Sequence, residues 1–314
     1  MNAPGSGEER EKGGRSLALM LLVIAAGFLL QSRTGADPDL WGHVRFGQDL
    51  WRTGRIIHPD SYSYLSGDQP WINHEWLSEA AFALAYDWAG GPGLLLLKGA
   101  ISLLLLGLAA GRLRRLPFGG PVVMAFLIFL LTPWFTAVRP QLFTYLFFLL
   151  VVLSIRAAEG GRPGWMWAVP PVLALWVNFH GGVLAGLGIF LGWAIIHLTA
   201  RLLPGWRAAA PRAAPGGMVL AAAAAAALAL LANPYGAGLP AFLLRTATVP
   251  RPDISEWRPI LIQTAYGAAY LLSLAVSAAG FRYSRKRKNP VLMILWLGCA
   301  LLPLAAIRHT PLFA

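Results

Sequence analysis

The stretch "PVVMAFLIFLLTPWFTAVRPQLFTYLFFLLVVLSI" (Pro121–Ile155) decides the fold class of this chain. It consists of two apolar runs that meet at "VRPQ", where Arg139 is the one charged residue of the stretch. A helix of about 20 apolar residues spans a bilayer, whereas the strands of a membrane barrel alternate apolar and polar residues. We therefore predict two membrane helices joined by a tight hairpin.

Similar runs recur along the whole chain of 314 residues, of which 57% are hydrophobic and 13% are charged. Inside lipid, only helices and closed barrels satisfy all backbone hydrogen bonds. We therefore predict an all-α fold, a polytopic transmembrane helix bundle of about nine spans that forms a single membrane domain over residues 1–314. The predicted spans are Ser16–Gln31, Gly93–Ala110, Pro121–Ala137, Leu142–Ile155, Trp165–Phe179, Val183–Ala200, Met218–Ala232, Ile260–Ala279 and Val291–Ile307.

The charge distribution predicts the orientation of the bundle. Most lysines and arginines behind the net charge of +12 fall in alternate loops, of which "FRYSRKRKNP" (Phe281–Pro290) is the most basic. Cytoplasmic loops favour such residues, so we expect a multi-pass protein of the cell (inner) membrane with a cytoplasmic N-terminus. A basic loop beside anionic lipid is explained by orientation alone, and no nucleic-acid partner is expected. The single cysteine, Cys299, excludes an internal disulfide.

This orientation places residues 33–91 in a first outer loop that is rich in polar side chains. An apolar stripe from Leu40 to Trp51 predicts a helix lying in the membrane interface, and a second interfacial helix is predicted over His74–Trp88. The plain alternative is that both helices merely cap the bundle.

The loop opens with "DPDLWGH", in which Asp37 and Asp39 are separated by one residue. Two acids so close repel each other unless a proton or a cation lies between them. One interpretation is a divalent cation held by Asp37, Asp39 and His43, since hard cations favour oxygen ligands. Another is that Asp39 caps the helix that follows it. The sequence leaves both open.

The layout of an anchor followed by "DPDLWGH", together with the blocks "RPQLFTYL", "LWVNFHGGVLAG", "NPYG" and "ISEW", resembles the GT-C superfamily of membrane glycosyltransferases. That superfamily includes protein O-mannosyltransferases and lipid A aminoarabinose transferases. The resemblance implies an inverting enzyme that moves a sugar from a polyprenyl-phosphate carrier to a hydroxyl of a glycan, lipid or protein acceptor, outside the cytoplasm. Many members have more spans and a soluble C-terminal part, so this chain is expected to be a C-terminally short member or a fragment.

The resemblance implies that the catalytic acid is Asp39 or, next, Asp37. Sugar transfer also needs positive charge for the departing lipid phosphate and an apolar groove for the prenyl chain. Arg139, and Arg308 with His309, lie at predicted outer ends of spans, and the guanidinium fork suits phosphate. The alternative for both arginines is contact with lipid headgroups.

Four further residues are candidates for binding a substrate, and one of them, Glu75, is alternatively a candidate for holding a metal ion. Glu75 and His74 open the second predicted helix, and Asn178 and His180 belong to "NFHGG". A lone histidine is more often structural, and this interpretation stays open for His180. Glu256 and Trp257 are either acceptor contacts or scaffold, and Lys98 within a span is a functional candidate by its position.

Two other classes of function remain possible from the sequence: a transporter or flippase of a lipid-linked or small polar substrate, and a non-catalytic membrane scaffold. A transporter carries its ionisable groups near mid-membrane, whereas here they concentrate at the predicted outer rim. Apart from a divalent cation, no cofactor is expected, because the chain has no nucleotide-binding or dinucleotide-binding motif.

Overall fold

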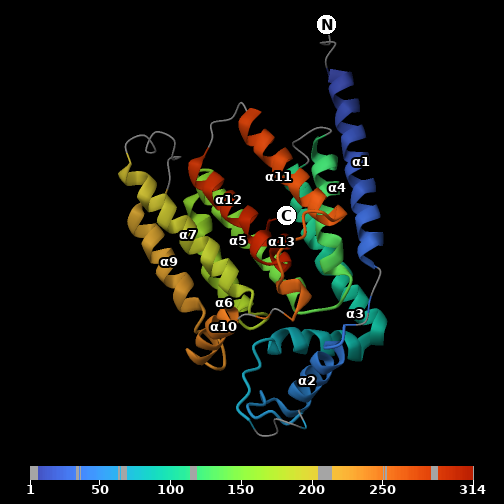
Figure 1. Ribbon diagram of the computed structural model, residues 1–314, viewed down its shortest axis with the longest axis vertical. Helices are drawn as coiled ribbons and strands as arrows, with labels where there is room; N and C mark the ends of the chain where they lie inside the picture. Colours follow the sequence, from blue (N-terminus) through green and yellow to red (C-terminus); the bar gives the residue numbers. More distant parts are fainter. Residues whose placement is uncertain are drawn as a thin grey trace.

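The computed structural model describes residues 6–32, 35, 37–62, 64, 69–113, 119–203, 214–249, 251, 253–283 and 289–313. Within these ranges the regular secondary structure is helical (Figure 1), and the one β contact is an isolated bridge between Pro59 and Pro70. The predicted all-α class is therefore confirmed. The most basic part of the predicted inner loop, residues 284–288, lies outside the described residues.

Within the described part of the chain, four helices are long and apolar enough, by length and composition, to cross a membrane. They are α1 (Ser6–Ser32), in which the apolar part is Gly13–Ser32, α3 (Trp76–Leu113), α5 (Gln141–Glu159) and α7 (Val183–Leu202). These helices indicate a membrane protein, while the side of the membrane on which each end lies stays a prediction.

Helices that are not among these four occupy the other predicted spans, so the number of nine stays a prediction. They are α4 (Gly119–Leu131) with η1 (Thr132–Phe135), α6 (Val169–Trp176) after η2 (Pro163–Ala168), α9 (Gly216–Ala229), α11 (Ala265–Tyr283) and α12 (Pro290–Ala305). The α-helix α6 is only 8 residues long. Pro170 and Pro171 stand at its start, because proline fits the first turn of a helix but not its interior. Four further short elements follow α9, namely α10 (Gly238–Thr248), η3 (Ser255–Trp257), η4 (Ile307–His309) and α13 (Thr310–Phe313).

Helix α5 lies at the centre of the bundle, where it packs against α3, α6 and α7. At its last residue, Glu159 accepts hydrogen bonds from Trp193 and His197 of α7, at 2.8 and 2.7 Å, and from Asn289 before α12, at 2.7 Å. These contacts hold the three helices together at one end of α5. The opposite end of α5 follows the "VRPQ" link, in which Arg139 lies, while a tight hairpin of the two flanking helices stays a prediction.

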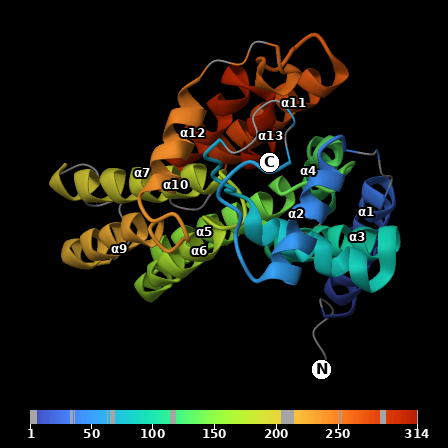
Figure 2. The same ribbon diagram turned by 90° about the horizontal axis from the view of Figure 1, so that it is seen from below.

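Both helices predicted in the first outer loop are present. Helix α2 (Leu40–Thr53) crosses the first part of α3, as Figure 2 shows from below. The crossing is close at Gly47, where an added Cβ would lie 2.0 Å from the carbonyl oxygen of Glu79. Leu40 and Val44 are buried as the stripe predicts, but Trp51 is 60% exposed and uses its indole N–H to donate to the Ala80 carbonyl at 2.9 Å.

The second predicted helix is the first part of α3, and it begins at Trp76 rather than at His74. It ends at a kink where Gly90 takes a φ of 62°, a conformation that glycine adopts without strain. Beyond Pro92 the second part of α3 continues into the bundle. Figure 1 shows the first part lying across the lower end of the bundle and the second part rising into it.

Candidate functional site

Four segments that are distant in the chain meet at two arginines, Arg139 and Arg308, which we call the arginine pair. Arg139 in the "VRPQ" link forms an ion pair with Asp37, which precedes α2. The Glu256 carboxylate lies 3.4 Å from Nη1 of Arg139 and 3.5 Å from Nη1 of Arg308. Trp257 packs its ring 4.5 Å below the Arg308 guanidinium. The sequence placed both arginines at one side of the bundle, and the structure brings them together around one carboxylate.

Asp37 and Asp39 differ in what their carboxylates do. Asp37 is buried, and its two oxygens are used by Arg139 and by the backbone N–H of Asp39, which donates at 3.0 Å. Asp39 is exposed, and its side chain makes no capping hydrogen bond to α2. The capping interpretation of Asp39 is therefore wrong. The Asp39 carboxylate therefore makes no capping bond, whereas both oxygens of the Asp37 carboxylate are bound.

A second group of ionisable side chains surrounds Glu75, and we call His43, His74, Glu75, Glu79 and His180 the acid–histidine cluster. The Nε2 atoms of His180 and His74 lie 3.5 and 3.6 Å from Oε1 of Glu75. Nε2 of His43 lies 3.9 Å from Oε2. The three imidazoles come from three different segments: α2, the turn before α3 and the link between α6 and α7.

The surroundings of Glu75 shift the pKa of its carboxyl group. Burial is the largest cause and raises the pKa to about 7, with further increases from the charges of Glu79 and Asp39. The charges of His43 and Arg308 act in the opposite direction. The side chain is nevertheless 15% exposed. Glu75 therefore combines access from outside with a proton affinity near neutrality, which is typical of groups that transfer protons.

His43 is held between two glutamates. Its Nδ1 lies 3.1 Å from Glu79, which is itself bound by the side-chain amide of Asn73. Burial lowers the pKa of His43, but the hydrogen bond to Glu79 and the charges of Glu75, Glu79 and Asp39 outweigh burial and raise it. Because a carboxylate accepts at Nδ1, that atom carries a proton and Nε2 faces Glu75.

The position and tautomer of His180 follow from its other partners. The backbone N–H of Gly182 donates to Nδ1 at 2.9 Å, and Thr144, which accepts from Trp176 at 3.1 Å, lies 2.8 Å from the same atom. Since a backbone N–H only donates, Nδ1 is an acceptor and the neutral ring carries its proton on Nε2. Burial lowers the pKa of His180 well below its ordinary value. His180 therefore presents a neutral N–H towards Glu75.

His74 completes the wall beside Glu75, with its ring centroid 5.5 Å from that of Phe242. Burial lowers its pKa to about 4. His309 is adjacent to Arg308, and burial followed by the Arg308 charge lowers its pKa. Among the described residues, the contacts of this end of the chain with Glu256 are made by Arg308 and not by His309.

Asn178, a predicted binding residue, has its amide group fully used in structure. It donates to the carbonyls of Ala174 and Ala232 at 2.9 and 2.8 Å and accepts from the Trp76 indole at 2.9 Å. It therefore fixes the start of α3 against the α6–α7 link. This places Glu75, the residue before Trp76, next to His180.

The predicted metal ligands do not form a common set. Asp37 turns to Arg139 and His43 turns to Glu79, away from a shared centre with Asp39. Within the described ranges no group of three or more His, Cys, Asp or Glu side chains is placed to hold a metal ion. A divalent cation stays a prediction from the sequence.

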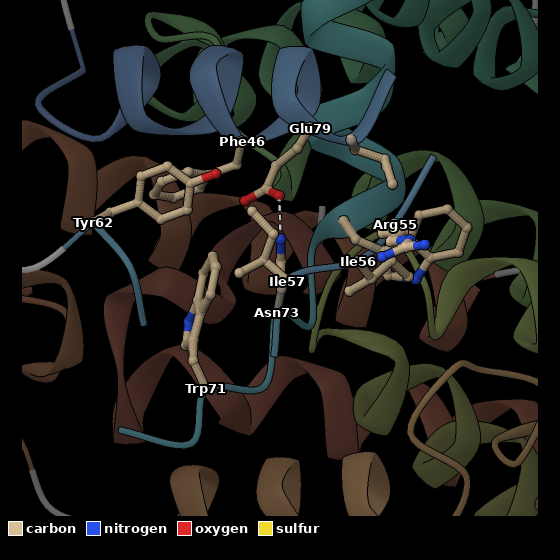
Figure 3. Close-up of a pocket in the computed structure, with 10 residues that line it drawn as sticks. Phe46, Arg55, Ile56, Ile57, Tyr62, Trp71, Asn73 and Glu79 are labelled. Atoms are coloured by element: carbon tan, nitrogen blue, oxygen red, sulfur yellow. Dashed lines mark hydrogen bonds between the residues drawn. The ribbon is translucent and has the colours of Figure 1, made fainter. Parts of the chain in front are cut away.

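Glu79 and Asn73 were not among the residues predicted to form the site. The available signal was the spacing of Glu79, one helical turn after Glu75 on the same helix face. Figure 3 shows the Glu79 carboxylate directed into a small cavity beside Phe46, Tyr62 and Trp71, with its hydrogen bond from Asn73. The volume of about 10 Å³ suits one water molecule rather than a sugar.

A larger cavity of about 350 Å³ lies between the end of α1 and the second part of α3. Its exposed lining surface is mainly apolar and includes Phe28, Pro92, Leu95 and Leu96, while the polar members are Gln31, Ser32, Lys98 and Ser102. α1 leaves this cavity shortly before Asp37, so the cavity and the arginine pair are reached from the same end of the bundle.

The two parts of the site are neighbours, because the charge of Arg308 acts on Glu75 and that of Asp39 on both Glu75 and Arg139. The arginine pair is suited to an anion, and the acid–histidine cluster is suited to moving a proton. Comparisons with protein-family models, curated proteins and solved structures found no match to this chain.

Proposed function

We propose that this protein is a membrane glycosyltransferase that moves a sugar from a polyprenyl-phosphate carrier to an acceptor hydroxyl on the non-cytoplasmic side, with inversion at the anomeric carbon. One observation carries the proposal: two guanidinium groups, of Arg139 and Arg308, face a single carboxylate at 3.4 and 3.5 Å. These distances are long for charge-assisted hydrogen bonds. A lipid phosphate would compete with Glu256 for the position between them.

The cavity between α1 and α3 supports a lipid-linked donor. Its exposed lining surface is mainly apolar, and its position near the end of α1 is close to the segment that carries Asp37. In this proposal the prenyl chain occupies the cavity and its phosphate binds the arginine pair. The transfer itself then needs a proton acceptor near the sugar.

In the proposed reaction, the acceptor oxygen forms a bond to the anomeric carbon while the bond from that carbon to the phosphate oxygen breaks. The electron pair of the broken bond stays on the lipid phosphate, where the arginine pair stabilises the added charge. The acceptor hydroxyl gives its proton to a carboxylate. Because Asp37 is committed to Arg139, the available carboxylates are Asp39 and Glu75.

The test is sugar transfer by purified protein in lipid nanodiscs, supplied with a panel of radiolabelled undecaprenyl-phosphate sugars and a membrane extract as acceptor. We expect Arg308→Gln and Arg139→Lys to lower transfer by about 10²–10³-fold, as the loss of a donor to developing negative charge does. Arg156→Gln is the matched control, because Arg156 is exposed at the far end of α5.

Transfer at the wild-type rate in both arginine variants would refute the phosphate assignment. If no donor supports transfer but the labelled lipid crosses the bilayer of proteoliposomes, the protein is a flippase instead. If the wild-type protein shows neither sugar transfer nor lipid translocation, the protein is instead a non-catalytic membrane scaffold.

A further inference from the structure

We infer that Glu75, rather than either aspartate of "DPDLWGH", is the carboxylate that takes the proton from the acceptor hydroxyl, with His43 and His180 positioning it. This inference rests on the proposed function and adds a named proton acceptor to it. It departs from the sequence, which points to Asp39 through its resemblance to a family.

The nearby carboxylates differ in whether their oxygens are already bound by other groups. Asp37 is bound by Arg139 and a backbone N–H, and Glu79 is bound by His43 and Asn73. The closest contacts of Glu75 are the three imidazole Nε2 atoms at 3.5, 3.6 and 3.9 Å, which exceed the length of a normal hydrogen bond. Its oxygens therefore face three imidazoles without a normal hydrogen bond to any of them.

The second argument is that the neighbours of Glu75 are rigidly placed. His180 is fixed by Thr144 and by the backbone of Gly182, and it presents Nε2–H towards Glu75. His43 is fixed by Glu79 and presents Nε2 to the other oxygen. A catalytic carboxylate needs such support, because small displacements lower the rate of proton transfer strongly.

The third argument is electrostatic. Charged and titratable groups face Glu75 from every segment packed against it, namely Asp39, His43, His74, Glu79, His180 and Arg308. Burial and the two acids favour its protonated form, while His43 and Arg308 favour the carboxylate. This balance places the pKa of Glu75 at about 7, so the same group can accept the proton and later release it to water at neutral pH.

The proposed step is balanced without any further reactant. The O–H bond of the acceptor breaks as its oxygen bonds to the anomeric carbon, and the proton moves to Glu75. The electron pair of the carbon–phosphate-oxygen bond remains on the phosphate beside Arg308. After release of the product, Glu75 returns the proton to solvent through its exposed edge.

The experiment compares wild type, Glu75→Gln, Glu75→Asp and Asp39→Asn in the transfer assay over about pH 5 to pH 9. We expect Glu75→Gln to lower kcat by about 10²–10⁴-fold while the donor KM is unchanged, because the glutamine amide cannot accept the proton. It should also abolish the fall in rate on the acid side of neutrality. Glu75→Asp should restore part of the rate, and Asp39→Asn should keep the acid limb of the pH profile.

A control shows whether Glu75→Gln still folds and binds the carrier lipid. It measures how far added undecaprenyl phosphate raises the temperature at which the variant unfolds. If Glu75→Gln does not fold, the pH profile of Glu75→Asp tests the assignment. A shorter carboxylate at the same site must shift the pH at which the transfer rate falls on the acid side. Transfer and an acid limb that persist in Glu75→Gln would overturn the assignment and leave the glycosyltransferase intact. Absence of transfer by the wild type with every donor would remove both.

Discussion

Asp37 and Arg139 form an ion pair that joins the segment between α1 and α2 to the link between η1 and α5. The Asp37 side chain is 2% exposed and that of Arg139 is 38% exposed. The pair therefore fixes the start of the first outer loop on the central helix. Through the second contact of Arg139, with Glu256, it also connects this loop to the segment before α11.

Removing one partner of this pair should destabilise the fold. We expect Asp37→Asn to lower the free energy of unfolding by about 2 kcal/mol, between the values typical of exposed and of buried pairs. Thermal unfolding in detergent measures the change. Arg45→Gln is the control, because the Arg45–Asp49 pair is open to solvent on the arginine side and should contribute less than about 1 kcal/mol. An Asp37→Asn protein as stable as wild type would show that the pair does not hold the loop.

Glu75 should make the stability of the protein depend on pH. Its pKa is raised from 4.5 to about 7 by burial, so the folded state binds the proton more tightly than the unfolded state does. Stability from this group is present below pH 4.5 and is lost as pH rises through 7. Glu75→Gln should therefore be the more stable protein at alkaline pH, by roughly 1–3 kcal/mol, and the difference should shrink on acidification. Unfolding curves that differ equally at all pH values would contradict this.

The cavity between α1 and α3 should determine recognition of the lipid tail. Leu96→Trp places a larger side chain in its lining, so we expect a higher KM for undecaprenyl-linked donors and little change for donors with a short prenyl chain. Leu104→Trp is the matched control on the same helix, because Leu104 is exposed outside the cavity lining. Equal effects of the two substitutions would mean that the tail binds elsewhere.

The predicted orientation can be tested by labelling single cysteines in a Cys299→Ser background. Thr53 at the end of α2 and Arg162 after α5 are both exposed. With a cytoplasmic N-terminus, Thr53→Cys should react with a membrane-impermeant maleimide once the outer face of the inner membrane is accessible. Arg162→Cys should react only after that membrane is opened. The reverse pattern would place the proposed site in the cytoplasm and exclude a lipid-linked donor used outside it.

The features that the sequence predicted well are local ones. Helix α2 and the burial of Leu40 and Val44 on its apolar stripe follow from the order of neighbouring residues, and both are found. The predicted number of spans is not confirmed where several local signals compete. In the segment Trp165–Phe179 the apolar composition indicates a span, but the α-helix there, which begins at the two prolines before Val172, is only 8 residues long.

The site was predictable as a set of candidates but not as a set of contacts. Topology placed Arg139 and Arg308 on one side, yet only folding shows that Glu256 lies between them. The amide of Asn178 is used in structure because its partners, Trp76 and Ala232, come from distant segments. The same is true of Glu79, whose contact with His43 depends on the close crossing of α2 over α3 at Gly47.

The bend at Gly90 gives α3 two arms with different surroundings. One arm carries Glu79 and starts beside Glu75, and the other forms a wall of the cavity between α1 and α3. The two arms are joined only through the bend at Gly90. A lipid chain bound against one arm and a carboxylate on the other are therefore connected by this one bend in the backbone. A substitution that makes this bend stiffer or more flexible would change the distance between the carrier lipid and the carboxylate without changing either group.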